Sequence, residues 1–153
     1  MSETTASNRI IVGVDGSESS IAALRRAAEV AAAFDAPLEA ITTWQYPAML
    51  DGYYPTDWSP RDDAEKILAT AVDQAFPGES PREVTQTVLE GLPARVLIEQ
   101  SAHASMLVLG SRGHGGFVGL LLGSVSAACA EHAHCPVLIM HAPRRTGAPS
   151  ADG

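Results

Sequence analysis

The chain has 153 residues, of which 46% are hydrophobic and 18% charged, so it suits one domain with a substantial core. Its formal charge of −8 at pH 7 repels nucleic acid and anionic lipid, and no local basic stripe offsets it. Two cysteines are too few for a disulfide framework, and no apolar run suits a signal peptide or a membrane span. We therefore expect a soluble, cytoplasmic protein with no nucleic-acid or membrane partner.

The two ends of the chain differ in composition from the rest. Residues 1–8 are small and polar, and residues 143–153 contain two prolines and two glycines. We predict a disordered arm over 1–8, one folded domain over 9–142 and a disordered tail over 143–153.

Short apolar runs alternate with amphipathic helical patterns from the start of the predicted domain. The run Ile10–Val14 predicts a buried strand, and a helix capped by Ser17 or Ser19 should follow it. Residues Pro37–Trp44 predict a second strand. A second helix should begin near Ser59, whose hydroxyl can cap it.

The same alternation continues in the second half of the chain. Its predicted elements are a strand at Val84–Val88, a helix opening at Pro93, a buried strand at Met106–Leu109, a helix from Ser124 to about Ala133, and a strand at Pro136–Met140. This order is typical of an α/β fold with a mostly parallel sheet and helices on both faces. Such sheets bind ligands at the carboxyl ends of their strands, where the strand order reverses.

A glycine-rich segment follows the fourth predicted strand. Gly110 and Gly113 let backbone N–H groups approach an anion, and Gly123 leads into a helix that Ser124 or Ser126 can cap. A strand, a glycine loop and a helix start together make a phosphate site. The alternative is that the glycines only provide a flexible connection.

The spacing of these residues resembles a known signature. The pattern Gly110-x2-Gly113-x9-Gly123-Ser124 is similar to the ATP-binding signature of the universal stress protein family. Asp15 after the first strand, Gly91-x-Pro93 after the third and the closing run Cys135–Ile139 also match family elements. The resemblance covers about Arg9–Ala142.

The resemblance implies a three-layer α/β sandwich, Rossmann-like and of the adenine nucleotide alpha-hydrolase-like type. Its five-stranded parallel sheet would have the order 3-2-1-4-5. The resemblance also implies a homodimer through the last strand, Val137–Met140, and ATP or another adenine nucleotide as ligand.

For the adenosine, the resemblance implies contacts with Gly13, Val14 and Asp15, with Thr43 near the adenine and Leu109 packed on the base or ribose. The Asp15 carboxylate can accept a hydrogen bond from the ribose or help to hold Mg²⁺. The alternative role for Asp15 is a helix cap.

The phosphates would lie against the glycine-rich segment, where backbone donors, hydroxyls and two basic side chains meet. The implied phosphate contacts are Gly110, Arg112, Gly113, His114, Gly123, Ser124, Val125 and Ser126. Arg112 and His114 would neutralise phosphate charge, because the sole lysine, Lys66, lies outside the segment. The alternative is that both are merely exposed polar loop residues.

Aromatic residues gather in the span Trp44–Trp58, which turn-forming residues mark as a long loop. We consider a lid near the nucleotide, a surface for a partner, or rings that cover a thin core.

A zinc site formed by Cys129, His132, His134 and Cys135 is a weaker hypothesis. Their spacing matches no usual zinc pattern. A helix end that leads into a buried strand explains these residues as well.

The function that fits these features is a homodimeric stress-response module that binds ATP as a sensor or switch. The alternatives are a cyclic AMP-binding relative, a slow ATP hydrolase with Mg²⁺ on Asp15, and an interaction module without nucleotide. No catalytic triad is recognisable, so we predict no catalytic residue.

Overall fold

A computed structural model describes residues 8–47, 57–78, 83–112 and 122–142. Strands and helices alternate strictly along these residues. The elements are β1 (Ile10–Gly13), α2 (Glu18–Phe34), β2 (Leu38–Trp44), α3 (Pro60–Ala75), β3 (Val84–Glu90), α4 (Pro93–Ser101), β4 (Met106–Gly110), α5 (Ser124–His132) and β5 (Val137–Met140).

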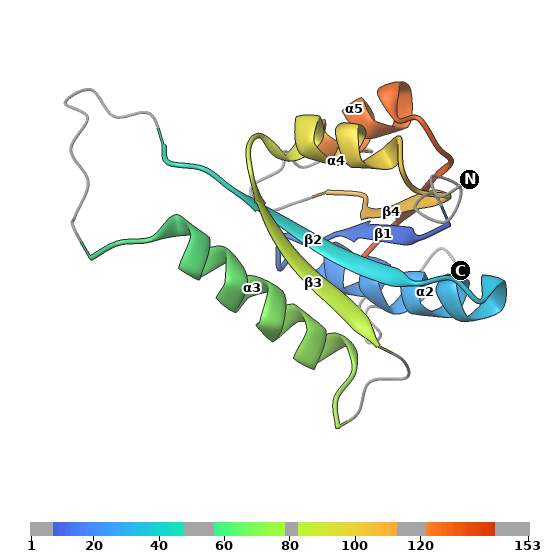
Figure 1. Cartoon of the computed structure of the whole chain (residues 1–153), viewed down its shortest axis with the longest axis horizontal. Helices are drawn as coiled ribbons and strands as arrows, with labels where there is room; N and C mark the ends of the chain where they lie inside the picture. The colour runs from blue at the N-terminus through green and yellow to red at the C-terminus, as the bar shows by residue number, and fades with distance from the viewer. Residues whose placement is uncertain (1–7, 48–56, 79–82, 113–121, 143–153) are drawn as a thin grey trace, which may run out of the picture.

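The strands form one parallel sheet in the order β3-β2-β1-β4-β5. Helices α2 and α3 cover one face, and α4 and α5 cover the other (Figure 1). The predicted three-layer sandwich and its strand order are confirmed. The chain leaves β1 toward β2 on one side and leaves β4 toward β5 on the other, so the strand order reverses between β1 and β4.

The core has two layers, because successive strand residues point to opposite faces. Ile10 and Val12 of β1 pack under α2 and α3, while Ile11 packs under α4 and α5. All three are fully buried, and burying a side chain of this size contributes about 1.5–3 kcal/mol. The central strand is therefore held from both sides, which gives the carboxyl edge of the sheet a rigid base.

Serines begin two of the helices as the sequence predicts. Ser17 caps α2 by accepting a hydrogen bond from the Ser20 N–H at 3.3 Å, and Ser59 caps α3 through the Asp62 N–H at 3.2 Å. The predicted serine cap of α5 is wrong. Gly123 occupies that position, and no side chain of the described residues accepts a capping hydrogen bond from the first turn of α5.

Polar side chains tie the elements together at the amino-terminal edge of the sheet. Arg9 forms an ion pair with Glu39 and donates to the Gln100 side chain at 2.8 Å and the His103 carbonyl at 3.0 Å. Thr87 donates to the same Glu39 carboxylate at 2.7 Å. These bonds join the start of β1 to β2, β3 and α4 at the edge opposite the strands' carboxyl ends.

Several predictions concern residues outside the described ranges. The predicted tail, nearly all of the predicted arm, Gly113, His114 and residues 48–56 of the aromatic loop fall there. Within the described ranges, no helix combines the length and the apolar character needed to cross a membrane.

Candidate functional site

The reversal of strand order brings the ends of β1 and β4 side by side. The two strands pair from Ile10 with Met106 to Val12 with Val108. Gly13 and Gly110 therefore end adjacent strands at the same edge of the sheet. In an open parallel sheet, this position is where a ligand binds.

Asp15 lies exposed just beyond β1. Its Oδ1 atom accepts a hydrogen bond from the Ser17 N–H at 2.9 Å. The cap of α2 is Ser17 itself, so the alternative interpretation of Asp15 as the helix cap is wrong. The carboxylate is held at the rim of the edge by one of its two oxygens.

Val14 is fixed between β1 and β2 by its backbone. Its N–H donates to the Ile41 carbonyl at 2.9 Å, and its carbonyl accepts from the buried Thr42 hydroxyl at 2.8 Å. Thr43, for which the family resemblance implies an adenine contact, is half-buried and points to the opposite face from Thr42. The hydroxyl that bonds the residue following β1 is therefore that of Thr42.

Gly13 and Leu109 are brought together beneath the edge. A Cβ atom on Gly13 would lie 2.7 Å from Leu109 Cδ2 and 2.9 Å from Leu97 Cδ1. The Leu109 side chain is buried in the core under α4 and α5. These residues form the floor of the site.

Gly110 has a packing reason to be glycine. A Cβ atom there would lie 2.7 Å from the Ser19 carbonyl carbon and 2.8 Å from the Ser20 nitrogen. The expectation that Gly110 leaves this space open for an anion is wrong. The structure fills it with the first turn of α2.

Ser111 joins β4 to the start of α5. Its N–H donates to the Met140 carbonyl at 2.7 Å, which extends the pairing of β4 with β5. Its carbonyl accepts from the Gly123 N–H at 2.7 Å and from the Ser126 hydroxyl at 2.8 Å. Residues 111 and 123 of the glycine-rich segment are thus in direct contact.

Arg112 is bonded to the start of α2. Its carbonyl accepts from the Ser19 hydroxyl at 2.6 Å and lies 3.4 Å from the Ser17 hydroxyl. Its own side chain is exposed. The last described residue before the glycine-rich segment therefore lies beside the helix that follows β1.

The first turn of α5 has the electrostatics of an anion site. No side chain caps it and no acidic residue lies in it, whereas α2 has Glu18 and α3 has Asp62 and Asp63 in their first turns. Within the described residues, the Ser124 and Val125 N–H groups have no hydrogen-bond acceptor. The positive end of the helix dipole contributes about 0.3–1 kcal/mol toward an exposed anion.

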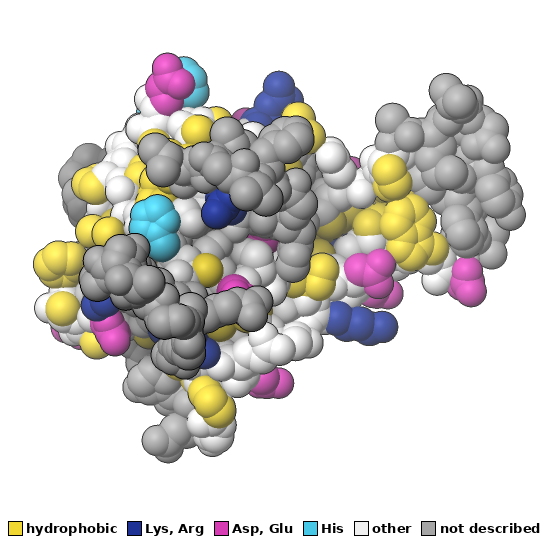
Figure 2. Space-filling model, turned by 180° about the vertical axis from the view of Figure 1, so that it is seen from behind, with side chains coloured by type: hydrophobic (Ala, Val, Ile, Leu, Met, Phe, Trp, Pro, Cys, Tyr) yellow, Lys and Arg dark blue, Asp and Glu magenta, His cyan; other side chains and the backbone are white. Residues whose placement is uncertain are grey.

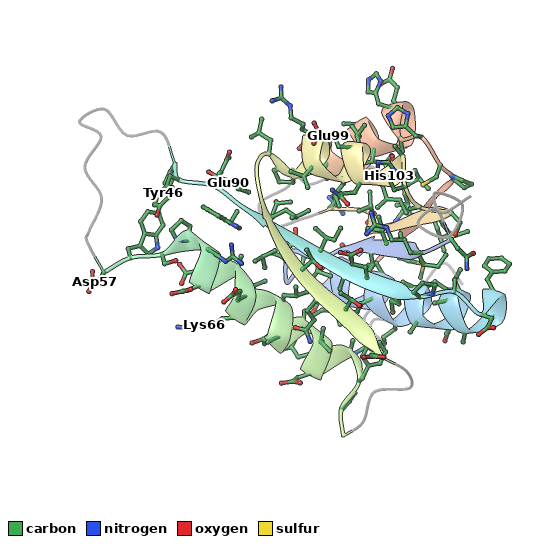
Figure 3. The ribbon with its side chains drawn as sticks, in the orientation of Figure 1. Tyr46, Asp57, Lys66, Glu90, Glu99 and His103 are labelled. Carbon is green, nitrogen blue, oxygen red and sulfur yellow. The ribbon has the colours of Figure 1, made fainter. Side chains whose placement is uncertain are left out.

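Positive charge is sparse around this edge. The sole lysine, Lys66, lies on α3 and points away from the sheet (Figure 3). On the face shown in Figure 2, the Lys and Arg side chains of the described residues stand apart among acidic and neutral ones. The backbone N–H groups at the start of α5 and the exposed Arg112 side chain lie at this edge.

Three aromatic rings lie in contact where β2 ends and α3 begins. Tyr46 packs edge-to-face against Trp44 at 6.0 Å and against Trp58 at 5.8 Å between ring centroids. The Trp58 indole donates to Asp63 Oδ2 at 3.0 Å, and Tyr46 stands at the end of the sheet (Figure 3). The role of a lid stays a prediction.

The cysteines and histidines near α5 differ in their exposure to solvent. Cys129 is buried and Cys135 is half-buried, whereas His132 and His134 are exposed. The described residues contain no cluster of three or more His, Cys, Asp or Glu side chains that could hold a metal ion.

Sequence reasoning missed Ser19, Thr42 and Ser111 as parts of this edge. Thr42 had no signal of its own, since the pairing of Ile41 with Gly13 that brings it beside Val14 is known only from the fold. Ser19 and Ser111 had none, because their contacts join residues that are distant in sequence. Such contacts depend on the tertiary fold.

The model of the universal stress protein family matches residues 7–141. The chain belongs to this family. Curated relatives include universal stress protein Rv2623 of Mycobacterium tuberculosis, 33% identical over 134 residues, covering 85% of this chain and 44% of that protein. Universal stress protein Mb2028c of Mycobacterium bovis is 34% identical over 153 residues, covering 92% of this chain and 50% of that protein. The chain thus spans about half the length of these relatives.

Solved structures of universal stress proteins have the same fold. One in complex with cAMP is 31% identical, with a TM-score of 0.67, and the match covers 90% of this chain and 99% of that chain. A family protein from Arabidopsis thaliana with AMP bound is 21% identical, with a TM-score of 0.65, and covers 94% of this chain and 96% of that one. The latter likeness shows the fold alone.

Proposed function

We propose that this universal stress protein binds ATP, or another adenine nucleotide, at the carboxyl ends of β1 and β4. The observation that carries the proposal is the start of α5. Its Ser124 and Val125 N–H groups have no acceptor among the described residues and lie next to the end of β4. Unpaired amides at a helix start suit a phosphate.

In this proposal the adenosine lies against the ends of β1 and β2. Gly13, Val14 and Leu109 provide the apolar floor, and Thr43 lies beside the adenine. The exposed Asp15 carboxylate accepts a hydrogen bond from the ribose. With ATP bound, Asp15 would also supply one oxygen ligand to Mg²⁺.

The phosphates would lie against α5 and the end of β4. Val125 would offer its amide, and Ser124 would offer its amide and its hydroxyl, whereas the Gly123 N–H is already bonded to the Ser111 carbonyl. The Arg112 guanidinium would neutralise charge, because Arg pairs with phosphate oxygens bidentately. Gly113 and His114 complete the proposed set.

ATP carries more negative charge than cyclic AMP, and the observations at this edge favour different ones of the two. The family's glycine signature, present here as Gly110-x2-Gly113-x9-Gly123-Ser124, favours ATP. The neighbour solved with cAMP and the sparse positive charge favour a ligand of lower charge. We place ATP first and cyclic AMP second, in a cytoplasmic homodimer that acts as a stress-response switch.

The first experiment is to denature freshly purified protein and identify the released nucleotide by mass spectrometry. Melting titrations with ATP, AMP and cyclic AMP follow, because a ligand at 100 times its Kd stabilises the folded state by about 2.7 kcal/mol. We expect an adenine nucleotide in the first assay and a rise in Tm in the second. An empty protein whose Tm ignores all three ligands would contradict the proposal.

The matched variant is Arg112→Ala, with Arg61→Ala as its control. Arg61 lies on α3 in an exposed pair with Glu65, away from the ends of β1 and β4. We expect Arg112→Ala to weaken ATP more than adenosine, since adenosine has no phosphate. Equal affinities for the wild type and Arg112→Ala would remove Arg112 from the site.

A further inference from the structure

Two buried serine hydroxyls hold the end of β4 from different helices. Ser19 on α2 donates to the Arg112 carbonyl at 2.6 Å, and Ser126 on α5 donates to the Ser111 carbonyl at 2.8 Å. Ser19 is 4% exposed and Ser126 is 3% exposed. A hydroxyl has one proton to donate, so both donors are engaged within the protein.

The two carbonyls stand immediately before the glycine-rich segment. The Ser111 carbonyl also accepts from the Gly123 N–H at 2.7 Å, so one oxygen binds both the N-cap and the first turn of α5. The Arg112 carbonyl is held against the first turn of α2. The end of β4 is thereby fixed relative to both helices that start at this edge.

This arrangement determines where the unpaired amides of α5 lie. Ser124 and Val125 stand between Gly123 and Ser126, the two residues bonded to Ser111. A donor set held in place before the ligand arrives avoids an ordering cost on binding. The loss of either the Ser19 or the Ser126 hydroxyl would make the positions of the Ser124 and Val125 amides less fixed, although both amides would remain.

We propose that Ser19 and Ser126 are positioning residues of the nucleotide site, and that neither hydroxyl contacts the ligand. They hold the Arg112 and Ser111 carbonyls and so fix the amides of the first turn of α5 for a phosphate. This inference rests on the proposed function. It assigns Ser126 a different role from the phosphate contact that the family resemblance implies.

The test compares Ser19→Ala and Ser126→Ala with Ser101→Ala as a matched control. Ser101 is 1% exposed, and its hydroxyl donates to the Ile98 carbonyl at 2.6 Å in the last turn of α4. Calorimetric titrations with AMP and with adenosine distinguish the contribution of the phosphate to the affinity from that of the nucleoside. We expect each test variant to weaken AMP about threefold to tenfold, the effect of one hydrogen bond. Adenosine affinity, and both affinities of the control, should match the wild type.

Hydrogen exchange separates positioning from direct contact. In ligand-free Ser126→Ala, the Gly123 amide should exchange faster, because the Ser111 carbonyl that accepts from it is no longer held in place by the Ser126 hydroxyl. Ser126→Thr keeps the hydroxyl and should restore both slow exchange and AMP affinity. If an alanine variant does not fold, the matching Ser→Cys variant replaces it, with a smaller effect in the same direction.

Wild-type affinity for AMP in both alanine variants would overturn the inference and leave the proposed function standing. An equal loss for AMP and adenosine would also overturn it. Weakened AMP with unchanged Gly123 exchange would assign Ser126 to the ligand instead. A wild-type protein that binds no adenine nucleotide would refute the proposed function itself.

Discussion

Burial keeps the Cys129 thiol in its protonated, unreactive form. Burial raises the pKa of its thiol from the ordinary 9.0 to about 11, and the nearby Cys135 adds to the rise. Burial also raises the pKa of the Cys135 thiol, which is half-buried. Because the thiolate is the reactive form, both cysteines should be poor nucleophiles near neutral pH.

We expect Cys135 to react with a disulfide reagent at pH 8 and Cys129 to stay protected until the protein unfolds. With a pKa of about 11, Cys129 has a thiolate fraction of roughly 10⁻³ at pH 8. Its labelling rate should rise with pH up to that pKa. Counting reacted thiols in native and denatured protein checks this, with Cys135→Ser as control. Two thiols that react equally fast in the native state would contradict it.

The serines show which residue-scale features the sequence could predict. Ser59 was recognisable as a cap, because its partner Asp62 is three residues away. The sequence allowed Ser17 or Ser19 for α2, and the structure uses Ser17. Ser19 instead bonds Arg112, 93 residues away, and no local pattern encodes such a partner.

At the scale of elements, the decisive contact is the approach of β4 to the start of α2. Gly110 permits it, because the backbone of Ser19 and Ser20 occupies the space of a Cβ atom. Gly13 also lacks room for a Cβ atom, but its neighbours are the ends of the Leu97 and Leu109 side chains. Side-chain ends can rotate, whereas the backbone of a capped helix turn cannot.

We therefore expect Gly110→Ala to destabilise the fold more than Gly13→Ala. The first should lower the free energy of unfolding by about 1–3 kcal/mol, the usual cost of overpacking. The second should cost less, since Leu97 and Leu109 can adjust. Urea unfolding of the two variants beside the wild type measures the difference. An equal loss of unfolding free energy in both variants would mean that the first turn of α2 moves aside as easily as the leucine side chains do.

The succession of elements was predictable, because each strand and helix carries its own hydrophobic period. Ile10–Val14 and Met106–Leu109 are short apolar runs, and both became central strands. The site was predictable only where a motif marks it. The family resemblance pointed to Asp15 and Gly110, but the α2 contact that explains Gly110 arises from long-range packing.

At the scale of the whole molecule, the two edges of the sheet differ in character. The β3 edge has the polar residues Thr85 and Gln86 exposed to solvent. Strand β5 is entirely apolar, and all four of its residues are half-buried. An open apolar edge strand offers unpaired backbone groups to another chain. The β5 edge therefore suits a second copy of this protein, as the family resemblance implies.

We expect the protein to be a dimer through β5 and Ile139→Lys to make it a monomer. Leu138 and Met140 pack on the core under α2, and Val137 packs on the core under α4 and α5. Ile139 is half-buried and belongs to neither of the two core layers. A lysine there should therefore place a charge at the β5 edge with little loss of stability.

The control for this substitution is Ile67→Lys, which places the same charge at a 41% exposed position on α3, a helix that packs on β2 and β3. Light scattering coupled to gel filtration, at micromolar protein, gives the mass of each species. A dimer for the wild type and Ile67→Lys, with a monomer for Ile139→Lys, would place the interface at β5. A dimeric Ile139→Lys would move the interface elsewhere, and a monomeric wild type would leave β5 as an edge exposed to solvent.

Because a two-fold axis places the same patch on both subunits, one lysine per chain puts two like charges at the interface. The substitution should therefore act twice in a β5 dimer and not at all in a monomer.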